Sequence, residues 1–169
     1  MPDSTAAPVS QRFPLLTFTE NSVAVLVELL VAPTGELSLV GTYTPTEPLL
    51  HLYGMDMPLH GIDGVGRPTR LDVISETAVS HGPLVANVTP TLHYFSGFEQ
   101  PFSLYPDGQV VLTLPISLDT LSQETPELEL SVTYMACSSG GGCEPPVTDR
   151  RFVVTIPAEI WQDLNRRSS

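Results

Sequence analysis

Apolar and polar residues alternate along several segments of this chain, and turn-forming residues bound each segment. The clearest case is residues 127–134, where four apolar side chains share one face and Glu127, Glu129, Ser131 and Thr133 share the other. A period of two is that of a β-strand with one buried face, so we expect this polar face to contact water. The same pattern predicts strands over residues 23–31, 37–43, 110–116 and 152–156.

Shorter apolar stretches predict further strands around residues 51–53, 70–74, 84–88 and 92–95. The 17 prolines are spread along the chain and leave little room for long helices. One short helix is expected from Pro157 to Leu164, with Ile160, Trp161 and Leu164 docking on the body. We therefore predict an all-β, two-sheet β-sandwich with a short C-terminal helix.

The chain is acidic, with 19 Asp and Glu residues against seven Arg, no Lys and a net charge of −12. Nucleic-acid binding requires a basic surface, and an anionic membrane would repel this one, so we exclude both kinds of partner. No apolar stretch is long enough to cross a bilayer. The length of 169 residues suits one domain, and we expect a monomer.

The chain begins with a low-complexity segment that lacks the basic and apolar regions of a secretion signal. Such a start fits either a cytosolic protein or a mature or cloned fragment whose secretion signal was removed. We favour the fragment, which would place the protein in the periplasm or otherwise outside the cytoplasm. Residues 1–20 are expected to be a flexible leader, residues 21–157 the sandwich, and residues 158–169 the helix and tail.

The two cysteines lie in Tyr134-Met-Ala-Cys137-Ser-Ser-Gly-Gly-Gly-Cys143-Glu-Pro-Pro146, between two predicted strands. Five small residues separate Cys137 from Cys143, and three of them are glycines that allow a tight reversal. A disulfide is therefore geometrically easy. Two sulfurs without a neighbouring His or Cys do not make a structural zinc site, and the spacing is not that of a thioredoxin motif.

The spacing alone leaves two roles open for this pair, a structural staple and a redox centre. A staple is the usual role in an exported β-domain. Closing so short a loop contributes only roughly 2 kcal/mol, however, and a Ser/Gly loop leaves the sulfurs near the surface. Pro145 and Pro146 cannot complete a strand ladder, so an open edge is expected beside the pair.

At these residues the sequence resembles a known family, the N-terminal periplasmic domain of the thiol-disulfide interchange protein DsbD. The aromatic Tyr134, the C-x5-C pair and the following Pro-Pro reproduce its fingerprint. Two more segments match, Leu50-His-Leu-Tyr53 with Arg67-Pro-Thr-Arg-Leu71, and Tyr94-Phe-Ser-Gly97, which is placed like the family's cap loop. The resemblance covers about residues 23–156.

The resemblance implies an immunoglobulin-like sandwich that acts as a thiol-disulfide oxidoreductase without a cofactor. In the family, the domain is the soluble part of a membrane protein and is reduced by that protein's thioredoxin-like domain. It passes electrons to periplasmic disulfide isomerases and to thioredoxin-like proteins of cytochrome c maturation. Partners of this thioredoxin-like class are therefore expected for this chain.

The resemblance also implies roles for individual residues. Cys143 would form the mixed disulfide and Cys137 would resolve it. Phe95, with Tyr94 beside it, would shield the pair, and Tyr53 would lie behind it. The family often carries acidic residues just before the cap aromatic, whereas this chain has His93 and Tyr94 there.

The local sequence predicts a thiol of low intrinsic reactivity. No Arg lies within four residues of either cysteine, and Glu144 adjoins Cys143. Nothing nearby in the sequence stabilises a thiolate. We expect slow reaction with small alkylating reagents and fast reaction with a thioredoxin-like protein that docks and supplies an activated sulfur.

Two alternatives compete with the relay. His51, Met55, Met57 and His60 gather imidazoles and thioethers within ten residues, a donor set that suits copper, especially Cu(I). The domain would then be a periplasmic copper-binding sandwich. The other alternative is a scaffold or adhesion module in which the disulfide is purely structural.

Overall fold

The computed structural model of the chain describes residues 9–74, 78–80, 82–118 and 127–168. Its larger sheet is antiparallel, in the order β1-β2-β3-β10-β6, and β7 also pairs with β10. These strands are β1 (Gln11–Glu20), β2 (Val23–Val31), β3 (Leu37–Pro45), β6 (Ala78–Ser80), β7 (Val85–Ala86) and β10 (Val110–Leu118).

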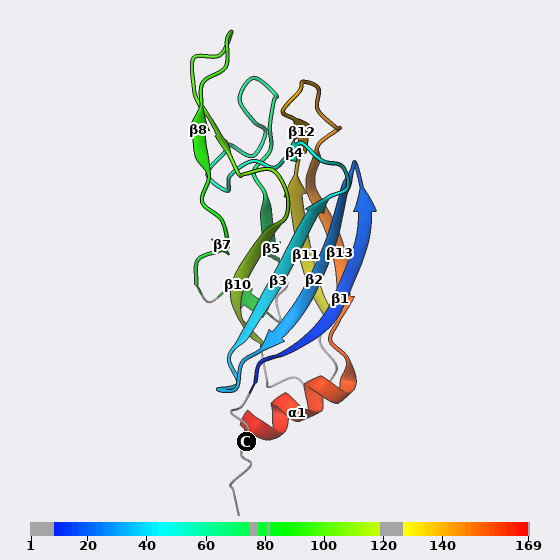
Figure 1. Ribbon diagram of the computed structural model, residues 1–169. Helices are drawn as coiled ribbons and strands as arrows, with labels where there is room; N and C mark the ends of the chain where they lie inside the picture. The colour runs from blue at the N-terminus through cyan, green and yellow to red at the C-terminus, as the bar shows by residue number, and fades with distance from the viewer. Residues whose placement is uncertain (1–8, 75–77, 81, 119–126, 169) are drawn as a thin grey trace, which may run out of the picture.

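A smaller antiparallel sheet faces the larger one, in the order β13-β11-β5. Two further strand pairs, β4 with β12 and β8 with β9, lie together at one end of the molecule, while α1 lies at the other end (Figure 1). Their bounds are β4 (Leu50–His51), β5 (Arg70–Val73), β8 (Thr91–His93), β9 (Phe102–Leu104), β11 (Glu127–Tyr134), β12 (Cys137–Ser138), β13 (Val147–Thr155) and α1 (Ala158–Ser168).

The main core lies between the two sheets and uses the alternating residues of the long strands. Every second residue of β2 is buried from Val23 to Val31, and β10 and β11 present their apolar residues to the same core. Each fully buried Val or Leu side chain contributes roughly 1.5–3 kcal/mol. The rings of Tyr43 and Tyr134, 5.9 Å apart, join the sheets edge to face. The predicted all-β sandwich is therefore confirmed.

The expected flexible leader is wrong for residues 11–20, which form β1 at the edge of the larger sheet. Proline is tolerated on an edge strand, and the register with β2 shifts between Pro14 and Leu16. This irregularity breaks the two-residue alternation and hides the strand in the sequence. Phe18 packs on Phe152 of β13 with ring centroids 4.7 Å apart, so β1 belongs to the sandwich.

The polar face of β11 is only partly exposed, contrary to expectation. Its first polar residue contacts water, but Ser131 and Thr133 are buried. Asp149 on the neighbouring strand satisfies both, because it accepts a hydrogen bond from the Ser131 hydroxyl and its N–H donates to Thr133 Oγ1 at 2.9 Å. Met57 and Pro68 line a groove together with these residues, so a connecting segment shelters this half of the strand.

The C-terminal helix starts where proline predicts and runs beyond the expected Leu164, to Ser168. Trp161 and Leu164 are buried against the main core, and Ile160 is half-buried there. Within the described residues, no helix combines the length and the apolar character that a membrane crossing requires.

Candidate functional site

The two cysteines form a disulfide at the end of the sandwich away from α1. Cys137 and Cys143 face each other as an antiparallel bridge with Cα atoms 4.0 Å apart. The Glu144 N–H donates to the Ala136 carbonyl at 2.8 Å on one side of the pair. Residues that face each other between ladder hydrogen bonds have closely spaced side chains, which brings the sulfurs together.

The loop between the cysteines is a tight turn that needs glycine. The Ser138 N–H donates to the Gly142 carbonyl at 2.8 Å, and the Gly141 N–H donates back to Ser138 at 3.0 Å. Gly141 and Gly142 have φ angles of 105° and 91°, which residues with a Cβ atom rarely adopt. The turn thus closes with its own backbone hydrogen bonds, independently of the sulfur bridge.

The two sulfurs lie in different environments. Cys137 is 4% exposed and belongs to a second, small apolar core with Tyr53, Phe102 and Met135. Cys143 is exposed at the surface. The Tyr53 hydroxyl donates a hydrogen bond to Cys137 Sγ at 3.0 Å. A reagent from solvent therefore meets Cys143 first, while Cys137 is held from behind.

Tyr53 is fixed from several directions. Its carbonyl accepts a hydrogen bond from the Thr69 hydroxyl at 2.7 Å, and its backbone bridges to Pro68 and Leu104. Gly66 packs on its ring so closely that a Cβ atom there would lie 3.2 Å from it. Burial raises the pKa of Tyr53 to about 12, so its hydroxyl stays protonated and remains a donor at neutral pH.

An aromatic cluster connects the loop after β8 to Tyr53. Phe95 and Phe98 contact Phe102 edge to face, with ring centroids 5.4 and 4.9 Å apart. Phe102 in turn lies 6.1 Å from the Tyr53 ring. Phe95 is 44% exposed and Phe98 is half-buried, so the cap residues lie between solvent and the small core.

A cavity of about 850 Å³ contains this arrangement, and both cysteines line it. Its other walls are mostly aromatic or polar side chains. They include Tyr53, His51, His93, Phe95, Phe98 and Asp107. A larger cavity of about 1140 Å³ lies near α1 and the turn between β2 and β3, but none of the described residues that line it is Cys or His. The cavity at the disulfide, by contrast, is lined by cysteine and histidine side chains, which can take part in chemistry.

Acidic and imidazole groups, rather than cations, surround the disulfide. Neither Lys nor Arg is among the described residues that line the cavity, whereas Asp107 is. His51 Nδ1 lies 3.8 Å from Asp107 Oδ1. Burial lowers the pKa of His51 below its ordinary value of 6.5, the Asp107 carboxylate opposes this effect, and His93 adds to it. His51 is therefore mainly neutral at pH 7.

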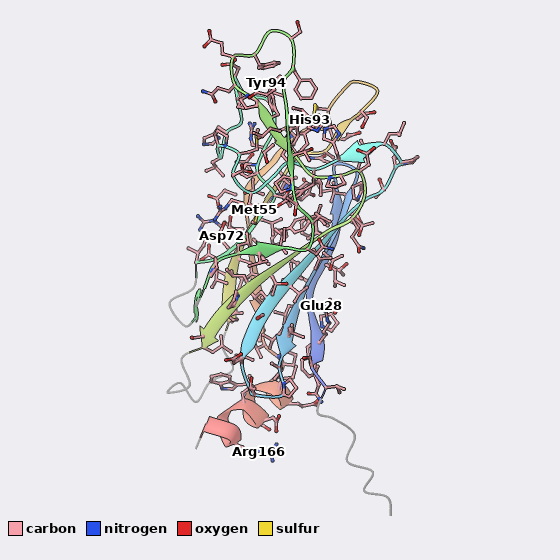
Figure 2. The ribbon with its side chains drawn as sticks, turned by 60° about the vertical axis from the view of Figure 1, so that its left-hand side comes forward. Glu28, Met55, Asp72, His93, Tyr94 and Arg166 are labelled. Atoms are coloured by element: carbon pink, nitrogen blue, oxygen red, sulfur yellow. A yellow bond between two sulfur atoms is a disulfide. The ribbon has the colours of Figure 1, made fainter. Side chains whose placement is uncertain are left out.

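Two of the residues expected near the pair line its cavity, and one does not. Phe95 and Tyr53 line it. Tyr94 does not, and its side chain is 76% exposed. Figure 2 shows Tyr94 and His93 at the tip that carries β8, far from Arg166 on α1. A shielding role for Tyr94 has no support in this placement.

The four residues expected as copper ligands lie in different environments. His51 faces the disulfide cavity, and Met57 is buried in the small core, where its sulfur accepts a hydrogen bond from the Ser103 N–H at 3.4 Å. Met55 packs on the main core and His60 is exposed. Among the described residues, no three His, Cys, Asp or Glu side chains are grouped so that they could hold a metal ion.

Several cavity residues were not predicted from the sequence, among them Phe98, Phe102 and Asp107. Phe98 and Phe102 were missed, although both follow the cap aromatic at short spacing, which is a usable signal. Asp107 was not predicted as a site residue. Its position beside His51 depends on a contact between segments far apart in the chain, and no local pattern encodes it.

No protein-family model matches the chain, and no curated protein matches it. Its structure is similar to the crystal structure of the N-terminal periplasmic domain of ScsB from Proteus mirabilis, with a TM-score of 0.51 and 14% sequence identity. The similarity covers 95% of this chain and 58% of that one, so the chain spans less than two thirds of the ScsB domain. This similarity supports the fold.

The difference in burial predicts a difference in reactivity. In the reduced protein, Cys143 should react with iodoacetamide at least about tenfold faster than Cys137, because the reagent needs access to the sulfur. Partial alkylation followed by peptide mass spectrometry measures both rates. The single-cysteine variants Cys137→Ser and Cys143→Ser, native and denatured, are the controls. Equal rates in the native protein would show that the two sulfurs are equally accessible.

Proposed function

We propose that this chain is a thiol-disulfide exchange domain that relays electrons between thioredoxin-like proteins outside the cytoplasm, through Cys137 and Cys143. The sequence resemblance to the N-terminal domain of DsbD supports this proposal. The fold similarity to a periplasmic domain agrees with the proposed location. The observation that carries the proposal is the one-sided burial of the disulfide, with Cys137 buried and Cys143 exposed, in a cavity that Phe95 also lines.

One-sided burial suits exchange because the reaction must begin at a defined sulfur. A thiolate attacks one sulfur in line with the S–S bond, and the other sulfur leaves. The exposed Cys143 can accept that attack, and the buried Cys137 can leave as a thiolate beside the Tyr53 hydroxyl. A hydrogen bond to an ionised sulfur is stronger than one to a neutral sulfur, so this contact gains strength as the bond opens.

A staple alone is a weak explanation for the pair. The turn between the cysteines already closes with backbone hydrogen bonds on both sides. The bridge adds a closed loop of about seven residues, worth roughly 2 kcal/mol in chain entropy. The main core is built from other residues, and of the two cysteines only Cys137 belongs to the small core at the tip.

The reduction proceeds in two displacements. A thiolate of the partner bonds to Cys143 Sγ, the disulfide breaks, and its electron pair passes to Cys137 Sγ, which takes up a proton. The partner's second thiolate then attacks the partner sulfur of the mixed disulfide, and Cys143 leaves and is protonated. The domain gains two electrons and two protons, and the partner is oxidised to its own disulfide.

The acidic surface favours partners of a particular kind. With a net charge of −12, the domain would attract a thioredoxin-like protein that has a basic rim around its active cysteine. By the family resemblance, such partners are periplasmic disulfide isomerases, cytochrome c maturation proteins and the thioredoxin-like domain of a membrane reductase.

Trapping a mixed disulfide tests the proposal. Cys137→Ser leaves only the exposed Cys143. When that sulfur is first activated as a mixed disulfide with thionitrobenzoate, a thioredoxin-like domain whose own resolving cysteine is replaced by Ser should displace thionitrobenzoate and form a covalent adduct. Cys143→Ser should form at least about tenfold less adduct, because Cys137 is buried. Non-reducing electrophoresis and intact mass spectrometry measure the yield.

Thermal unfolding of both variants controls for loss of structure. If folded Cys137→Ser forms no adduct with any thioredoxin-like domain tested, the relay proposal fails and the scaffold alternative gains support. If Cys143→Ser traps the partner better, the roles given to the two cysteines are reversed.

The cap gives a second test, on neighbouring residues of one loop. Replacing Phe95 by Ala should speed reduction of the disulfide by glutathione about tenfold, because the exchange rate depends on how easily the small thiol reaches the sulfur. Tyr94→Ala is the matched control, since Tyr94 does not line the cavity. Stopped alkylation of released thiols gives the rate. A Phe95→Ala variant that reacts no faster than Tyr94→Ala would remove the shielding role.

A further inference from the structure

His51 is placed beside the sulfur that leaves when the disulfide opens. It lies on β4 directly opposite Cys137 on β12, and only 7% of it is exposed. Its ring lies 5.5 Å from the ring of Tyr53, whose hydroxyl donates to Cys137 Sγ. Because His51 and Cys137 are paired across two strands and both are buried, a charge on the histidine acts on the sulfur with less screening than at the surface.

An acidic partner holds His51 in this position. Asp107 Oδ1 lies 3.8 Å from His51 Nδ1, and the same carboxylate accepts a hydrogen bond from the Ser139 hydroxyl at 3.2 Å. Ser139 belongs to the turn between the two cysteines, so the disulfide loop and the histidine are connected through Asp107. A histidine that faces a fixed carboxylate can take up a proton in a site that otherwise disfavours charge.

The other titratable groups near His51 determine which residues could make the exchange reaction depend on pH. The titratable side chains that face it, from four different segments, are Tyr53, His93, Tyr105, Asp107 and the cysteines. Burial raises the pKa values of both tyrosines, so they stay protonated up to pH 8. The histidines are then the groups in this cavity whose ordinary titration range lies between pH 5 and 8. His93 is exposed and pairs with Thr91.

Opening the disulfide places an unfavourable negative charge on Cys137. The electron pair of the broken bond leaves a thiolate on a buried sulfur, with the Tyr53 hydroxyl as its hydrogen-bond donor. A buried anion without a compensating cation is costly. Since no Lys or Arg is among the described cavity residues, a compensating positive charge from this lining requires a residue that gains a proton.

We propose that His51 supplies this charge: in its protonated form it stabilises the Cys137 thiolate and then passes it a proton. The proposal rests on the exchange reaction proposed above.

The protons balance when a dithiol is the reductant. Its first thiol ionises and bonds to Cys143, the released proton is taken up by His51, and the imidazolium protonates Cys137. The reductant's second thiol then completes its own disulfide, and Cys143 leaves and takes a proton from water.

The direction of the pH effect follows from burial. Because burial lowers the pKa of His51 below 6.5, the protonated form accumulates only below that pH. The rate constant for each attacking thiolate ion should therefore rise as the medium becomes acidic. Thiol reductants lose their reactive thiolate under the same conditions, so His51 would offset part of that loss.

The test is the pH dependence of reduction by dithiothreitol, with each rate divided by the concentration of its thiolate. For the wild-type domain we expect this rate constant to rise by about tenfold between about pH 8 and pH 5, a typical size for the coupling of two sites. His51→Gln should give a flat profile. Its thermal unfolding midpoint, which should match that of the wild-type domain, shows that the variant is folded.

Two further variants make the assignment specific. Asp107→Asn removes the carboxylate that favours the imidazolium, so the rise should move to lower pH. His93→Gln should keep the rise. A flat wild-type profile, an unchanged rise in His51→Gln, or loss of the rise in His93→Gln alone would overturn the proposal. Dithiothreitol needs no docking, so a failure of the relay proposal, in which no thioredoxin-like protein is trapped, is distinguishable from a failure here.

Discussion

The hydrogen bond from Tyr53 to Cys137 Sγ is the contact on which the functional end of this molecule depends. It fixes one sulfur of the disulfide in a small apolar core and leaves the other at the surface. A symmetric, fully exposed pair would have no preferred point of attack. The large core between the sheets is made of other residues, so the tip can open its disulfide while the sandwich keeps its packing.

Much of this fold is predictable from the sequence because the long strands alternate strictly. Residues 23–31 and 127–134 form β2 and β11 with the expected bounds, since one face of each strand is buried. β1 was missed because Pro14 and the following leucines break the alternation at a register shift. The burial of Ser131 and Thr133 was missed for another reason: their partner, Asp149, lies on a neighbouring strand.

The site could be predicted only in part, for a similar physical reason. The cysteines, Tyr53 and Phe95 lie in local motifs, and the structure places them around one cavity. Asp107 and His51 come from segments that are far apart in the chain, so no local residue spacing predicts their contact. His51 was considered as a metal ligand because residue type and local density suggested it. Its strand pairing with Cys137 instead places it beside the disulfide.

The central claim is that the Cys137–Cys143 disulfide exchanges under cellular conditions. The most direct measurement is its reduction potential, obtained by equilibrating the domain in graded thiol buffers and counting alkylated sulfurs by mass. The account predicts a value between about −200 and −270 mV, the range of proteins that exchange disulfides. A value below about −300 mV would contradict it, because such a disulfide resists reduction by thiol pools and behaves as a structural bridge.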